Sequence, residues 1–211
     1  MKLGEIKLET LRIMNINHDS VLTLDKIGTY NSEAKYARFL NNMTNSINRA
    51  IDIINHKKIL PEKSIEMSKM NVVEGAINNR YDLSTLDDFV AVARIIYEDN
   101  NTKYLEKVTF EREGNKLVVS NKYLPEALIL LYHPKVSSIT DSHSDNDEIV
   151  GLPDELARII PYFVKFDLYQ EDEPNIAVAA KSVFEQSIDN LRHYEDEQEE
   201  FYIEKVYACE V

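Results

Sequence analysis

The chain has little cysteine, little glycine and no long apolar run. Its 211 residues include one cysteine, Cys209, and five glycines. A single cysteine cannot form an internal disulfide, which suits a cytosolic assembly site. So few glycines disfavour a nucleotide-cradling loop. No stretch approaches the roughly 18 apolar residues of a membrane helix, and the N-terminus lacks the apolar block of a secretory signal, so we expect no membrane association.

Signatures of catalysis are missing as well. The sequence contains no G-x-S-x-G elbow, no glycine-rich phosphate loop and no H-E-x-x-H motif. Nothing around Cys209 is placed to lower the pKa of its thiol, so we interpret this residue as incidental. The sequence therefore predicts a protein that is not an enzyme, with no catalytic residues and no cofactor.

Potential metal ligands do not form a recognisable site. The loop DSHSDNDE has the alternating carboxylates that suit calcium, but it lacks the glycine and the later glutamate that an EF-hand loop requires. No two histidines have the i, i+4 spacing of a zinc-binding helix. We therefore expect a solvated acidic loop and no metal site. The residues considered are Asp141, His143, Asp145, Asp147 and Glu148 in the loop, and His18, His56, His133 and His193 elsewhere.

Negative charge predominates. Asp and Glu outnumber Lys and Arg by 37 to 24, which gives a formal net charge of −13. This balance argues against a protein whose bulk surface binds phosphates, although a local basic patch could still contact DNA. Simple solubility is the plainest interpretation of the charge, and an acidic wall that repels DNA is a second.

The periodicities indicate an α+β protein, in which a helical bundle carries an inserted small antiparallel β-sheet or sandwich. We expect residues 1–62 to form the N-terminal helical part and residues 63–150 to form the β-rich insertion. Residues 151–195 are predicted to form a helical hairpin that completes the bundle. Residues 196–211 are predicted to be an extended docking tail.

Two helices are predicted in the N-terminal part. Residues 3–14 place apolar side chains at helical spacing, and residues 32–56 form the clearest amphipathic pattern in the chain. Asn31 or Ser32 can cap the second helix by accepting a hydrogen bond from an unpaired backbone N–H. The residues between the two helices read as a connection.

The C-terminal hairpin is predicted over residues 152–194, with an acidic turn at residues 170–173. Pro153 and Pro174 suit the first turns of the two helices, where a missing N–H has no cost. Pro161 should kink or restart the first helix. The second helix has an apolar face predicted from residues that recur every three or four positions: Ile176, Ala180, Val183, Phe184, Ser187, Leu191 and Tyr194.

The insertion is predicted from runs of β-branched and aromatic residues separated by turn residues. Gly114-Asn115 marks a tight hairpin, because both residue types tolerate positive φ angles. The predicted strands are residues 64–68, 89–97, 108–112, 116–120 and 127–132, with a continuation over 136–139.

The C-terminal segment is aromatic and β-prone, and it follows the charged spacer EDEQEE. Such a segment can add a strand to the sheet of its own chain or to the sheet edge of a partner, and we favour the partner. The residues predicted to make this contact are Phe201, Tyr202, Ile203, Val206 and Tyr207.

The order of these elements resembles a known family. A helix carrying NSINRAIDIINHKKILP, then a β insertion, then LPDELARIIPYFVKFDLYQEDEPNIAVAAKSVFEQSIDNL is similar to the head–tail connector (adaptor) proteins of tailed bacteriophages, of the gatekeeper or tail-tubular type. The resemblance covers about residues 32–195 and rests on degenerate patterns, with no invariant catalytic residue.

The resemblance implies a structural protein of the virion neck that is made in the host cytoplasm. About a dozen copies would form a homo-oligomeric ring beneath the portal protein, contact tail or nozzle proteins, and enclose the channel for double-stranded DNA without sequence-specific binding. The C-terminal tail would dock on the portal. Two alternatives from other classes are a small acidic enzyme, which needs a pocket with perturbed carboxylates, and a DNA-mimic regulatory protein, which needs a stripe of carboxylates spaced like phosphates.

Overall fold

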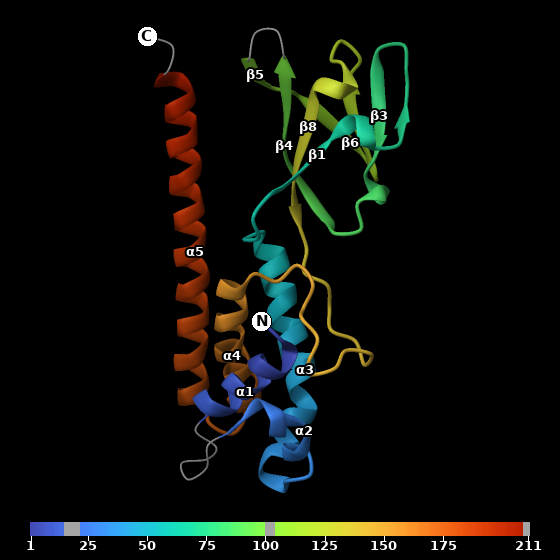
Figure 1. The fold of residues 1–211 in the computed structure, drawn as a ribbon. Coiled ribbons are helices and arrows are strands. Elements are labelled where there is room, and N and C mark those ends of the chain that lie inside the picture. The colour runs from blue at the N-terminus through green and yellow to red at the C-terminus, as the bar shows by residue number, and fades with distance from the viewer. Residues whose placement is uncertain (15–21, 100–103, 209–211) are drawn as a thin grey trace. The chain divides into compact units, whose positions relative to one another are not determined.

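The computed structural model describes residues 1–14, 22–99 and 104–208, with the side chains of residues 35, 99, 104–106 and 192–208 left aside. The chain divides into two compact units. A helical unit comprises Met1–Ile59 and Val136–Val211, and an insertion unit comprises Leu60–Lys135. The predicted α+β class is confirmed, because the β-rich segment is inserted in the sequence between the helical segments (Figure 1).

The described α-helices belong to the helical unit and confirm the two predicted N-terminal helices and the C-terminal hairpin. The predicted connection after the first helix contains a short helix that the sequence analysis missed. The bounds are α1 Leu3–Ile13, α2 Ile27–Tyr30, α3 Ala34–Lys57, α4 Asp154–Tyr169 and α5 Pro174–Ala208.

Helix α3 supplies much of the core of the helical unit. Met43, Ile47, Ile51 and Ile54 lie on one face and are completely buried, so the helical periodicity of the apolar residues follows directly from burial. The predicted cap is wrong, because Glu33 is the N-cap residue and no side chain caps the helix. The packing of this apolar face makes a side-chain cap dispensable.

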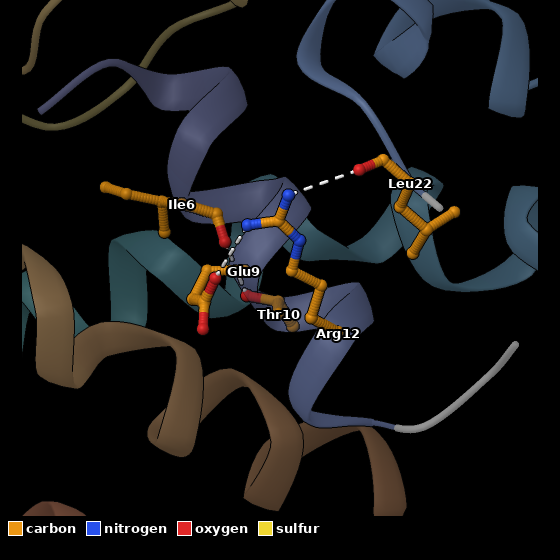
Figure 2. Close-up of polar contacts among 5 residues, drawn as sticks. All are labelled: Ile6, Glu9, Thr10, Arg12 and Leu22. Carbon is orange, nitrogen blue, oxygen red and sulfur yellow. Dashed lines mark hydrogen bonds and ion pairs between the residues drawn. The ribbon is translucent and has the colours of Figure 1, made fainter. Parts of the chain in front are cut away.

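Helix α1 packs on this core and is tied to the next described segment by a polar contact. Arg12 Nη1 lies 3.3 Å from a carboxylate oxygen of Glu9, and Arg12 Nη2 donates to the carbonyl of Leu22 at 3.2 Å (Figure 2). In the buried part of α1, the Thr10 hydroxyl donates to the carbonyl of Ile6 at 2.8 Å. The buried hydroxyl is therefore paired within its own helix.

Helix α4 runs without interruption through Pro161, so the predicted restart does not occur. Proline removes one backbone hydrogen bond and disfavours a helix interior. The neighbouring side chains of Ile160, Phe163 and Val164 are buried. Their packing offsets the local cost of the proline.

Helix α5 overturns the predicted extended tail. It continues over 35 residues from Pro174 to Ala208, so residues 196–208 are helical. The spacer EDEQEE contains glutamate and glutamine, which have good helix propensity, and neither glycine nor proline interrupts the segment after Pro174. Figure 1 shows α5 reaching well past the end of the 16-residue helix α4.

The insertion unit is a sandwich of two antiparallel four-stranded sheets, with strand orders β1-β8-β4-β5 and β2-β3-β7-β6. The hairpin at Gly114 is confirmed, and this glycine has a φ of 61°. The strands are β1 Lys63–Glu66, β2 Val72–Val73, β3 Asn78–Asp82, β4 Phe89–Asp99, β5 Tyr104–Lys107, β6 Phe110–Glu113, β7 Lys116–Ser120 and β8 Leu128–Pro134.

The core of the insertion lies between its two sheets. Its completely buried members include Met67, Tyr81, Ile95, Leu117 and Leu130. These residues come from both sheets and from the short turn after β1, so the two sheets bury a common apolar layer. The strands β2, β3 and β5 were not predicted.

The predicted insertion boundary at residue 150 is wrong. The insertion unit ends at Lys135, and the chain from Val136 onward belongs to the helical unit. The predicted strand over 136–139 is also wrong. Its backbone groups are bound by two asparagine side chains of α3, so they do not join the sheet. Asn55 bonds the N–H and carbonyl of Val136 at 2.8 and 3.1 Å, and Asn48 bonds those of Ile139 at 2.8 and 2.9 Å.

Candidate interaction surfaces

The predicted docking residues lie in the last turns of α5. Phe201, Tyr202, Ile203, Val206 and Tyr207 have helical backbone, and their side chains lie outside the described part of the chain. The predicted strand conformation is therefore wrong, because these residues continue a helix. Their contact with a partner stays a prediction.

The acidic loop before α4 uses its carboxylates within the helical unit. Asp145 accepts a hydrogen bond from the Lys7 ammonium at 2.7 Å, and Asp147 accepts one from the backbone N–H of Ser144 at 2.7 Å. The backbone bond from Ser144 is the main cause that lowers the pKa of Asp147. In the residues that the structure describes, no group of three or more His, Cys, Asp and Glu side chains is placed to hold a metal ion.

Two of the histidines make local contacts. The Nδ1 atom of His56 lies 2.7 Å from the carbonyl oxygen of Asp52, one turn earlier in α3. The Nδ1 atom of His143 lies 2.9 Å from the hydroxyl of Thr140. His18 lies outside the described residues. The contact of His56 lies within the last turns of α3, and the contact of His143 lies within the acidic loop.

A polar groove of about 290 Å³ lies between α3 and the C-terminal end of α4. Its central feature is Asp167, whose two carboxylate oxygens lie 2.9 and 3.0 Å from Nη1 of Arg49. The hydroxyl of Ser46 donates to the same carboxylate at 2.6 Å. The lining contains neither histidine nor cysteine, so the groove offers amide and guanidinium contacts for a polar ligand. Its lining residues are Asn42, Asn45, Ser46, Arg49, Asp167, Leu168, Gln170, Glu171 and Asp172.

In the insertion unit, Asp88 joins two strands through its carboxylate. It accepts hydrogen bonds from the Lys63 ammonium and, at 3.0 Å, from the Tyr132 hydroxyl. Burial raises the pKa of Tyr132 to about 12, with the hydrogen bond to Asp88 adding to the effect. Burial alone would raise the pKa of Asp88, but the bonds from Lys63 and Tyr132 outweigh it and lower the pKa. At neutral pH the carboxylate is charged and the phenol is neutral, which suits a structural link better than proton transfer.

The Tyr132 pKa leads to a testable pH dependence. The unfolded chain releases the phenol proton near pH 10, whereas the folded chain retains it to about pH 12. The contribution of the Tyr132 phenol to the free energy of unfolding is therefore fully present below pH 10. It falls between pH 10 and 12, by up to about 1.4 kcal/mol per pH unit. Urea titrations should show a shallower fall over this range for Tyr132→Phe than for the unsubstituted protein. Equal slopes would contradict the assignment.

The insertion unit exposes aliphatic side chains on two adjacent segments. We call Val72, Val73, Ile77 and Leu124 the hairpin-tip patch, and their exposed fractions are 39%, 60%, 74% and 63%. The side-chain amide of Asn121 donates to the carbonyls of Gly75 and Ala76 at 3.2 and 2.9 Å. The backbone N–H of Asn121 also donates to the carbonyl of Ile77 at 2.9 Å. These bonds hold the turn after β2 beside Asn121, which follows β7. Val72 and Val73 are consecutive in β2, so their side chains leave opposite faces of the strand.

Helix α5 has a second exposed surface without charge. We call Ile176, Ala179, Val183, Gln186 and Asn190 the α5 flank, and all five are exposed. They recur at three- and four-residue spacing, so they share one side of the helix. Among residues 174–191, the residues that α5 buries are Ala177, Ala180, Phe184 and Ile188. Ile176 and Val183 belong to the predicted apolar face, but both are exposed, because the buried face of α5 is rotated away from these two residues.

Sequence reasoning missed both the hairpin-tip patch and the α5 flank. The sequence signals for these surfaces were the aliphatic residues around Gly75 in a polar stretch, and five uncharged residues at alternating three- and four-residue spacing in α5.

No protein-family model matches the chain, and no curated protein matches it in a sequence search. Among the described residues, no helix is long and apolar enough to span a lipid bilayer.

Proposed function

We propose that this protein is a structural head–tail connector (adaptor) of a tailed phage. It forms a ring beneath the portal, links the capsid to tail or nozzle proteins, and surrounds the DNA channel in the virion neck. The observation that supports this proposal is that both units display aliphatic side chains to solvent, in the hairpin-tip patch and on the α5 flank. Exposed apolar area costs about 25 cal/mol per Å², which contact with another protein recovers.

The distribution of charge supports the same proposal. Residues 60–135 contain 10 basic and 12 acidic residues, so most of the net charge of −13 lies in the helical unit. A ring built from acidic helical units would repel the phosphates of DNA in its channel and keep the DNA from sticking.

The test is assembly with the portal protein encoded in the same genome. We expect the mixture to elute as a complex whose mass, from light scattering, corresponds to a closed ring of copies on the portal. Electron cryo-microscopy should show that ring in axial views. A protein that stays monomeric while the portal is present and folded would refute the proposal.

The role of the C-terminal part of α5 is tested by truncation. Removing residues 199–211 shortens α5 by its last turns and should weaken portal binding by about tenfold or more, since a docking segment carries a large share of a binding energy. Far-UV circular dichroism checks that the remaining helices are intact. Removing residues 209–211 alone is the matched control and should leave binding unchanged. Full binding by both truncated proteins would rule out docking through this segment.

A further inference from the structure

We draw no further inference here: the strongest candidate, the polar groove between α3 and the C-terminal end of α4, has its buried carboxylate of Asp167 already paired with Arg49 and Ser46, and nothing in the residues that the structure describes shows which ligand would fill it.

Discussion

Replacing Asn48 and Asn55 together with alanine is expected to lower the free energy of unfolding by about 4 kcal/mol. Each asparagine bonds both the N–H and the carbonyl of one backbone residue, Asn48 at Ile139 and Asn55 at Val136. The two side chains thus replace the hydrogen bonds that a neighbouring strand would make. Alanine leaves all four partly buried backbone groups without their partners, and each lost bond costs about 1 kcal/mol.

The effect is measured by urea titration with far-UV circular dichroism as the probe, since the described α-helices lie in the helical unit. Asn45→Ala is the matched control, because Asn45 is an exposed asparagine on the same helix, and it should change stability by less than about 0.5 kcal/mol. Each single substitution should account for about half of the effect. A double variant as stable as the control would show that water satisfies the backbone of residues 136–139.

These two asparagines also show why the sequence could not locate the end of the insertion. Residues 136–139 have the β-branched and apolar composition of a strand, and Val136 and Ile139 are buried. Composition reports the burial of these two side chains, which is present. It does not report the hydrogen-bond partner, which here is a pair of side chains about 80 to 90 residues earlier in the chain.

Elements with strong periodicity were predictable. Helix α3 was predicted because its buried residues recur at helical spacing. Strands β4 and β8 were predicted because their apolar runs are short, and the run of β4 is also rich in β-branched side chains. Strand β3, with the sequence Asn78-Asn79-Arg80-Tyr81-Asp82, was missed because its asparagine and aspartate residues have low β propensity. Its pairing with β7 along its whole length imposes the strand.

The α5 helix shows the opposite case, in which local composition suggested the wrong element. The aromatic and β-branched residues after position 200 favour a strand in isolation. A helix that already extends over more than 20 residues adds one hydrogen bond for each further residue, without a new nucleation cost. The backbone conformation of the predicted docking residues depends on this continuity, because Phe201 to Tyr207 lie in the continued part of the helix.

Phe184→Ala is expected to destabilise the protein by about 4 kcal/mol, a large part of the 5–15 kcal/mol that usually separates folded from unfolded chains. Phe184 is 2% exposed, and its ring centroid lies 5.1 Å from that of Phe163 in α4. Removing the ring leaves a cavity between α4 and α5 and forfeits the aromatic contact. Helix α5 packs mainly against α4. We therefore expect α5 to separate from α4 in the variant at moderate urea concentrations.

The neighbouring residue supplies the control for this prediction. Val183 is 40% exposed on the α5 flank, so Val183→Ala should change the unfolding free energy by less than about 0.5 kcal/mol. Phe184→Leu, which keeps most of the apolar volume, should cost less than about 1.5 kcal/mol. The unfolding free energies of the three variants are measured by urea titration and compared with that of the unsubstituted protein. Equal losses for Val183→Ala and Phe184→Ala would mean that α5 buries a different face, and both the packing described for the helical unit and the exposure of the α5 flank would then be wrong.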